Sequence, residues 1–441
     1  MNKMLKMLIL LILASGCNQA DQGGSKDNDE EKIIVDTDRE NKLTFSRAYL
    51  YDKVLGLLLG SAIGDAMGAP TEMWTRDQMQ IEYGFIDNLD TMVRNPSPEG
   101  TWEFNLPAGG TTDDTRWKAL LIEFSLNQPG RLSAIDWASF ITKTYQSQIE
   151  ALKNTDAFEP EPFEIEARKM AWLQEWAMVA KPYHEQDIDA YLSNLHRFYG
   201  GEMTCAGMLY TPAIGGQFPG NPEEAYHQAF DLSIFDLGYA RDLSALTAAM
   251  VAIAMSPEAS LQSMLNVFRD IDPEGFFKSR LVGRSAYRIY RDALYVMHEA
   301  EQESIIENKK LPEAWQPLLK RYDSLELFKM KKAFELLDEK NEVLPFHPGE
   351  IMLINLVALM YGNLDFQKTM EFVVNYGRDN DTVAAVTGAI LGAYLGASAL
   401  PEKLKTQVLK TNIEKLDLDL ERIAQNLTTA IWDRSAGDNK G

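Results

Sequence analysis

The sequence predicts an all-α protein whose main part is one large helical-bundle domain with glycine-striped helices at its centre. Over most of residues 45–432, apolar residues recur three and four positions apart, and alternating strand-like runs bounded by turns are scarce. Two of these segments carry glycine at every fourth position. The hydrophobic fraction of 45% and the charged fraction of 24% are those of an ordinary folded domain. No period of 20–50 residues repeats, so a solenoid is not predicted.

The chain is predicted to begin with a lipoprotein signal peptide over residues 1–16. This segment has two lysines, an apolar run and then small residues directly before Cys17. Ala-Ser-Gly-Cys resembles a bacterial lipobox, in which the cysteine is lipidated and becomes the new N-terminus. We therefore expect lipidation of Cys17 and an anchored location in the bacterial cell envelope, on the periplasmic or extracellular face. Replacing Cys17 with Ser should release the protein from the membrane fraction, and an unchanged distribution would contradict the prediction.

The alternative for this segment is a buried N-terminal helix that happens to end in cysteine. The polar stretch that follows disfavours it, because that stretch offers nothing to pack on. Residues 17–44 are rich in Gly, Ser, Asp, Glu and Asn, and we predict a flexible acidic tether. No later segment is expected to span a membrane.

The overall charge excludes nucleic-acid binding by bulk electrostatics. The chain has 43 Lys and Arg against 65 Asp and Glu, a net charge of −22, whereas affinity for nucleic acid rests on basic residues that neutralise phosphates. Apart from Cys17 the one cysteine is Cys205, so no disulfide is predicted. The stability of the fold must therefore come from core burial.

Clear helical segments are expected at 242–255, 325–338 and 349–361, separated by Pro, Gly and Asn breaks. The stretch 151–200 is expected to form an insertion or a cap on the core.

The glycine stripes are formed by Gly56, Gly60, Gly64 and Gly68 and by Gly388, Gly392 and Gly396. Glycine costs about 1 kcal/mol relative to alanine inside a helix, so a stripe of it indicates a close backbone approach. We expect both helices at the centre of the protein, where they could pack against each other. A membrane-dimer motif is excluded because Asp65 interrupts the first stripe. The spacing is also not that of a dinucleotide-binding or phosphate-binding glycine loop.

Two acidic clusters each precede a predicted helix. Residues 112–115 read Thr-Asp-Asp-Thr, and residues 377–382 read Gly-Arg-Asp-Asn-Asp-Thr. One interpretation is helix capping, in which Asp and Thr oxygens accept the free N–H groups of the first turn. The other is coordination of hard cations, which prefer carboxylate and hydroxyl oxygens. A cap explains one oxygen at each site and not two carboxylates, so we favour capping combined with metal ligation.

The two clusters are far apart in the sequence, which does not show that they meet. If they meet, four carboxylates and the threonine hydroxyls could hold two divalent ions, which would orient a substrate with adjacent oxygens. An EF-hand is excluded because the loop from Asp379 lacks its glycine and its terminal glutamate. Zinc is not expected, because the five histidines form no zinc motif and Cys205 has no partner cysteine.

The segment GSAIGDAMGAPTE at 60–72 and the two acidic clusters together resemble the ADP-ribosylglycohydrolase family in order and spacing. The resemblance covers roughly residues 50–400. It implies an all-α, single-domain fold with two divalent cations, Mg²⁺ first and Mn²⁺ as the alternative, at the base of an ADP-ribose cleft. It also implies hydrolysis of the bond between C1″ of the distal ribose and an acceptor side chain or a small leaving group.

The same resemblance implies roles for individual residues. Those that fall on the family's metal ligands are Glu72, Thr112, Asp113, Asp114, Asp379, Asp381 and Thr382. Three of them, Glu72, Asp113 and Asp379, are the expected catalytic residues, with Glu72 in metal ligation or in activating the attacking water. Asp65 is expected either to support a loop or a metal-bound water, or to serve as a cap or buried ion pair. The expected partner is a small-molecule or ADP-ribosylated protein substrate, and we expect a monomer.

The sequence departs from the family pattern at Arg378 and Asn380, and at 238–242, where many members have a Thr-His pair. Arg378 could bind a substrate phosphate or bridge to a neighbouring acid. Gly215 and Gly216 lie in a glycine-rich stretch, 213–220, that could pass close to a diphosphate or could be an ordinary inter-helix turn. These departures leave the substrate open. A non-catalytic, membrane-tethered lipoprotein that binds ADP-ribose or another metal-dependent ligand is the alternative function, and the intact ligand positions favour the enzyme.

Overall fold

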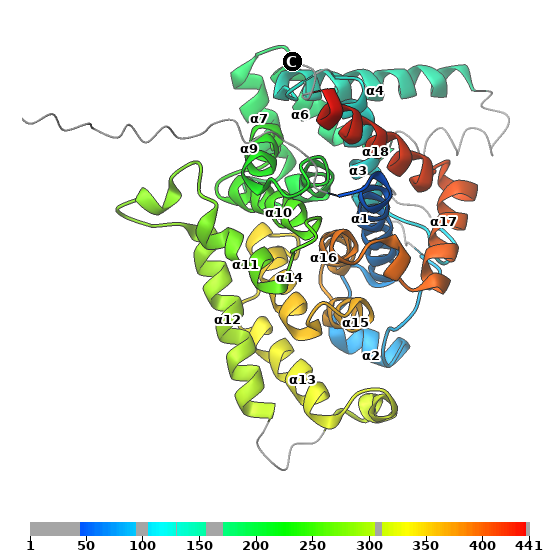
Figure 1. Cartoon of the computed structure of the whole chain (residues 1–441), viewed down its shortest axis with the longest axis vertical. Helices are drawn as coiled ribbons and strands as arrows, with labels where there is room; N and C mark the ends of the chain where they lie inside the picture. Colours follow the sequence, from blue (N-terminus) through cyan, green and yellow to red (C-terminus); the bar gives the residue numbers. More distant parts are fainter. Residues whose placement is uncertain (1–44, 94–104, 129, 156–170, 305–310, 438–441) are drawn as a thin grey trace, which may run out of the picture. The chain divides into compact units, whose positions relative to one another are not determined.

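The computed structural model describes residues 45–93, 105–128, 130–155, 171–304 and 311–437 (Figure 1). The chain divides into two units, 1–41 and 42–441. The predicted signal peptide, the Cys17 anchor and the whole of the predicted tether lie outside the described residues. In the second unit the described residues form helices, apart from loops and one isolated bridge between Met92 and Leu106. The prediction of a single all-α domain is confirmed.

The helices were assigned as follows. They are α1 (Arg47–Gly68), α2 (Arg76–Glu82), α3 (Asp113–Leu126), α4 (Ala134–Asn154), α6 (Gln174–His184), α7 (Ile188–Phe198), α8 (Thr211–Gly215), α9 (Pro222–Leu232), α10 (Ala240–Ala254), α11 (Leu261–Asp270), α12 (Ser285–Ser304), α13 (Ser324–Asp338), α14 (Pro348–Gly362), α15 (Phe366–Tyr376), α16 (Asn380–Leu395), α17 (Glu402–Leu416) and α18 (Leu420–Gly437). Short 3₁₀ turns include η1 (Ala69–Thr71), η2 (Ala206–Leu209) and η3 (Phe276–Lys278).

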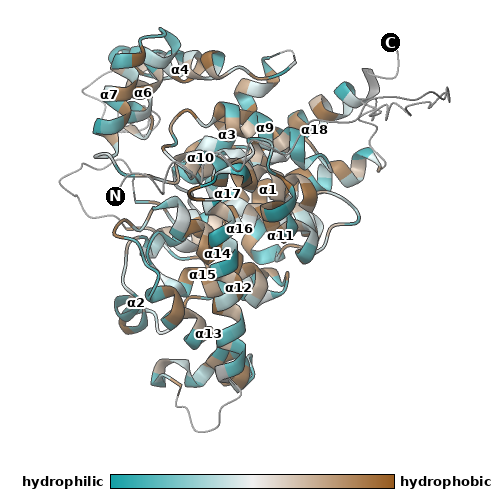
Figure 2. Ribbon diagram, turned by 90° about the vertical axis from the view of Figure 1, so that its left-hand side faces the viewer, coloured by the Kyte–Doolittle hydropathy of each residue, from teal (hydrophilic) through white to brown (hydrophobic). Residues whose placement is uncertain are grey.

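The helices predicted from periodicity are α10, α13 and α14, each within a few residues of its expected ends. Local signals explain their limits. Asp323 and Glu326 form a capping box at the start of α13, which satisfies backbone N–H groups of its first turn. Asn363, in the left-handed conformation, ends α14. In Figure 2, α13 has both hydrophilic and hydrophobic turns, as expected for a helix with one face on the core.

The two glycine-striped helices, α1 and α16, pack directly against each other (Figure 1). A Cβ atom added to Gly60 would lie 2.2 Å from the carbonyl oxygen of Gly388, so only glycine allows the two backbones to come this close. The stripe residues face each other in the order Gly56 with Gly392, Gly60 with Gly388, and Gly64 with Ala384. The partner number falls by four as the α1 number rises by four, so the helices run antiparallel.

The helix α1 is a core helix. Together with η1 it is long and apolar enough by composition to cross a membrane, but 94% of its apolar stretch is buried inside the protein. The prediction that no later segment spans a membrane therefore stays a prediction, and the apolar composition of α1 is that of a core helix. The reason is that a helix surrounded by core on all sides needs no polar face.

The region after α4 contributes α6 and α7, and its aromatic residues pack on α3. The ring of Trp117 in α3 lies 5.2 Å from that of Trp172 and 4.7 Å from that of Trp176, measured between centroids in edge-to-face geometry. These contacts attach the predicted cap to the helix that begins at the first acidic cluster.

Candidate metal centre

The packing of α1 on α16 determines which ends of these helices meet. A Cβ atom added to Gly68, the last residue of α1, would lie 2.4 Å from the Cα atom of Asp381 in the first turn of α16. The chain leaves α1 through the short turn η1 and reaches Glu72. The side chain of Asn380 donates to the hydroxyl of Thr71 (2.9 Å), which holds this turn against α16. The glycine stripe thus brings Glu72 to the second acidic cluster.

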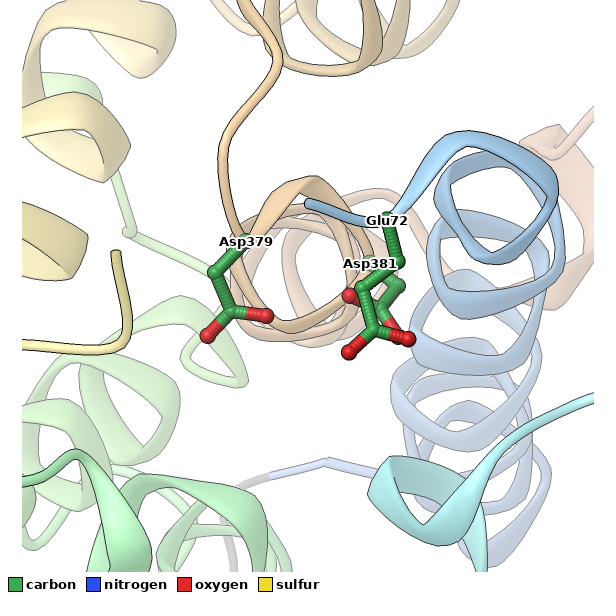
Figure 3. Close-up of side chains that lie close together, drawn as sticks. All are labelled: Glu72, Asp379 and Asp381. Atoms are coloured by element: carbon green, nitrogen blue, oxygen red, sulfur yellow. The ribbon is translucent and has the colours of Figure 1, made fainter. Parts of the chain in front are cut away.

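Three carboxylates converge at this point. Glu72, Asp379 and Asp381 each offer an oxygen, and the three oxygens lie within 4.8 Å of one another. Figure 3 shows the three side chains pointing to the same side of the start of α16. Asp379 and Asp381 are each 3% exposed, whereas Glu72 is half-buried. Three carboxylates this close in a buried setting repel one another unless positive charge is present.

The first acidic cluster joins the second through a hydrogen bond. The hydroxyl of Thr382 donates to Oδ2 of Asp114 (3.1 Å), which links the first turns of α16 and α3. The two clusters therefore meet, a point the sequence left open. Asp113 and Asp114 form the first turn of α3, and both are buried. They lie outside the group of three converging carboxylates.

Helix capping is also present, and Asp65 performs most of it. Its carboxylate accepts hydrogen bonds from the backbone N–H groups of Thr112 (2.9 Å) and Thr115 (3.1 Å) and from the hydroxyl of Thr115 (2.5 Å). The Thr112 hydroxyl accepts from the N–H of Asp114 (3.3 Å). The structure therefore supports the capping alternative for Asp65 and gives Thr112 a capping role. Asp379 sits at the N-cap of α16 without a side-chain capping bond.

Burial changes the acidity of the carboxyl groups in this cluster. It raises the pKa of Asp114 to about 7, an effect that Lys118 opposes and that Asp65 reinforces. Burial also raises the pKa of Asp379, and the charges of Glu72 and Asp114 raise it further. The Oδ1 atom of Asp114 is buried and has no hydrogen-bond partner among the residues that the structure describes. Buried carboxylate oxygens held together, one of them unpaired, fit a hard divalent cation.

A comparison with protein families shows which family the chain belongs to. The ADP-ribosylglycohydrolase family model matches residues 46–436. The chain belongs to the ADP-ribosylglycohydrolase family. A curated relative, described as the uncharacterized protein YegU of Escherichia coli (strain K12), is 32% identical over 95 residues, which are 20% of this chain and 27% of that protein. The match thus spans about a quarter of that relative's length. A solved structure described as an ADP-ribosylglycohydrolase-related protein complex aligns with a TM-score of 0.49 and 18% identity, over 87% of this chain and 99% of that one.

In this member of the family the cluster also contains a buried cation, Lys118, which was not predicted from the sequence. Lys118 is 1% exposed and its ammonium donates to the backbone carbonyl of Asp114 (2.9 Å). Burial lowers its pKa, and the charges of Asp114, Asp65 and Asp113 act in the opposite direction. The available signal was a lysine four residues after Asp114 and directly before the apolar run 119–122.

Replacing Lys118 with Met should lower the free energy of unfolding of the metal-free protein by about 3 kcal/mol, since it leaves buried carboxylates without a compensating charge. Urea denaturation in the presence of a chelator measures this loss. The matched control is Lys53→Met, because Lys53 is also buried, and its ammonium donates to the backbone carbonyl of Tyr394. The free energy of unfolding should fall clearly less in the control than in Lys118→Met. Equal losses in both variants would contradict an electrostatic role specific to the cluster.

Arg378 bridges to an acid, which is one of the two alternatives left open by the sequence. Its guanidinium binds both oxygens of Glu350 (2.7 and 2.8 Å) and donates to the carbonyl of Glu342 (2.7 Å). Glu350 is 2% exposed, so the pair neutralises a buried carboxylate. The backbone of Arg378 is in the left-handed region (φ 68°) and accepts from Met73 N–H (2.7 Å). The contact of Arg378 with a substrate phosphate stays a prediction.

For Gly215 and Gly216 the sequence left open an approach to a diphosphate or an ordinary turn between helices, and the structure places them at the end of a short helix. Gly215 ends α8, Gly216 follows directly, and both are buried. A Cβ atom at Gly215 would lie 2.3 Å from the carbonyl oxygen of Ala248 in α10. Gly215 is therefore explained by close helix packing.

Proposed function

We propose that the protein is a metal-dependent glycohydrolase that cleaves the C1″ glycosidic bond of ADP-ribosylated side chains or of a related ribosyl compound. The observation that carries this proposal is the convergence of Glu72, Asp379 and Asp381 within 4.8 Å, at the meeting point of the two acidic clusters. Membership of the ADP-ribosylglycohydrolase family supports the reaction class.

The carboxylates would hold one or two divalent cations, Mg²⁺ or Mn²⁺. When bound, such ions supply the positive charge that binds and orients adjacent hydroxyl oxygens of a ribose. Glu72 is the half-buried member of the group and therefore the one best placed to accept a proton from a solvent water that attacks C1″. The negative charges of Asp379 and Asp381 would stabilise the oxocarbenium-like transition state of glycoside cleavage.

Two alternatives to this function are an enzyme with a small ribosyl substrate and a binding module that does not hydrolyse its ligand. If the proposed envelope location holds, few ADP-ribosylated cytoplasmic proteins are within reach, which favours a small ribosyl compound such as a nucleoside. A tethered module that binds ADP-ribose without hydrolysis is the alternative from another class. The presence of all three converging carboxylates favours the enzyme, because a binding module does not need a proton acceptor.

The test is release of free sugar by the purified protein from ADP-ribosyl-arginine, ADP-ribosyl-serine and nucleosides, with Mg²⁺, with Mn²⁺ and with a chelator. We expect metal-dependent release from at least one substrate, and its loss in Asp113→Ala and Asp379→Ala. Asp77→Ala, which removes an exposed carboxylate from the first turn of α2, is the control and should keep full activity. Tight binding of ADP-ribose without turnover would favour the binding module. Failure to bind any divalent metal would contradict the proposal.

A further inference from the structure

The connection between α11 and α12 carries an exposed apolar tip. Figure 1 shows this loop, in yellow-green, projecting from the ends of the two helices that it joins. Leu281 is 96% exposed, Val282 58% and Phe277 42%. Leu281 and Val282 are adjacent, so the loop exposes two large aliphatic side chains together, and contact with an apolar phase or a partner would remove this apolar area from water.

Basic residues flank the apolar tip. Lys278 and Arg280 alternate with it, and Arg288 and Arg291 follow on α12, all four exposed. Residues 275–291 contain no Asp or Glu, although the chain as a whole carries a net charge of −22. In the described part of the chain, neither Lys278 nor Arg280 has an acidic partner. Over the whole region 272–291, five basic residues stand against two acidic ones, Asp272 and Glu274, so the region is basic on an acidic protein and complementary to an anionic surface.

The loop is held in place from both ends. The carboxylate of Asp272 accepts from the backbone N–H groups of Phe276 (2.9 Å) and Phe277 (3.0 Å). At the other end the buried guanidinium of Arg284 binds both oxygens of Asp242 in α10 (2.9 and 2.7 Å) and donates to the carbonyl of Ile271. The exposure of the tip is therefore a property of an ordered loop with fixed ends.

We propose that this loop is a membrane-contacting element that binds a bilayer containing anionic phospholipids. Leu281 and Val282 would enter the region between the headgroups, while Lys278 and Arg280 contact the phosphates around them, the arrangement that binds peripheral proteins to anionic membranes. A bilayer fits the tip because it offers an apolar phase directly beneath anionic phosphates, which matches adjacent aliphatic and basic side chains. The proposal concerns residues 272–291 and does not depend on lipidation of Cys17 or on hydrolysis.

A fluorescent probe on the tip tests the proposal. The full chain with Cys17→Ser is prepared with Leu281→Cys and labelled with a polarity-sensitive fluorophore; Cys205 is buried and should not react. The matched control is the same label at Val343→Cys, a residue that is 91% exposed elsewhere on the protein. Vesicles of phosphatidylcholine, with and without phosphatidylglycerol, are the ligands. Residues 1–16 could bind vesicles themselves. The proposal is therefore judged by the difference in fluorescence response between positions 281 and 343.

We expect a blue shift and brighter emission at position 281 with anionic vesicles at low salt, a weaker response with phosphatidylcholine alone, and none at position 343. Lys278→Glu with Arg280→Glu should lower the response to anionic lipid by at least about tenfold, because each basic residue near such a surface contributes roughly fivefold. An equal response at both positions, or no response at 281, would overturn the proposal. A response at 281 that depends on protein concentration and not on vesicles would overturn it in favour of contact between two copies.

Discussion

Gly60→Ala should lower the free energy of unfolding by about 3 kcal/mol or more, even though alanine is the better helix former. The added Cβ atom would lie 2.2 Å from the carbonyl oxygen of Gly388 and 2.9 Å from the Cα atom of Gly392. Both are backbone atoms of the buried helix α16, so neither can rotate away. The contact can be relieved only by separating α1 from α16 along their length, which opens the centre of the core.

Gly216→Ala is the control for this prediction. Its added Cβ atom would lie 3.0 Å from the side chain of Leu57, which can adjust, and its backbone is in the right-handed helical region. We expect a change within about 1 kcal/mol for this variant. Urea denaturation measures both. If Gly60→Ala were as stable as the wild type, the two backbones could not be as close as the structure places them.

The glycine stripes show how far sequence reasoning reaches in this fold. The four-residue spacing predicts that another backbone segment approaches each helix closely. Both helices lie at the centre of the protein, as expected. The register of the pair does not follow from spacing, because two stripes can face each other in several offsets. It is this register, which places Gly68 on Asp381, that brings Glu72 to the carboxylates.

A similar limit applies to Gly215 and Arg378. A buried glycine signals a close approach but not the identity of the approaching atom, which at Gly215 is the backbone carbonyl oxygen of Ala248. The partner of Arg378 is Glu350, which lies on α14, and helical periodicity gives no information on such long-range pairs.

Lys118 was missed for a different reason, since buried lysines are rare and an apolar helix pattern tolerates one basic residue without losing its period.

Asp379→Ala should abolish stabilisation by divalent metal while leaving the metal-free protein at least as stable as the wild type. In the wild type, Mg²⁺ or Mn²⁺ at a hundred times its dissociation constant should raise the free energy of unfolding by about 2.7 kcal/mol, and in the variant by almost nothing. Hydrolysis should fall by about 10²-fold or more, since charge placed at the reaction centre typically contributes this much.

The physical reason for this combination lies in the surroundings of Asp379. Its carboxylate is 3% exposed and faces Glu72 and Asp114, whose charges, together with burial, hold its pKa well above the usual range. Without a cation the ionised group is therefore unfavourable, and its removal relieves repulsion. Because Asp379 makes no capping bond at the start of α16, alanine removes no cap there.

A matched capping residue separates the two interpretations of the acidic cluster. Asp365 is the N-cap of α15, and its side chain accepts from the N–H of Lys368 (2.8 Å), so Asp365→Ala should cost about 1 kcal/mol without changing metal affinity. If the second cluster served only to cap α16, Asp379→Ala would behave in the same way, with a similar loss of stability and an unchanged response to metal. Opposite signs of the stability change at the two positions, measured in a chelator, would instead show that Asp379 is kept at a cost to stability, as expected of a residue retained to bind a cation.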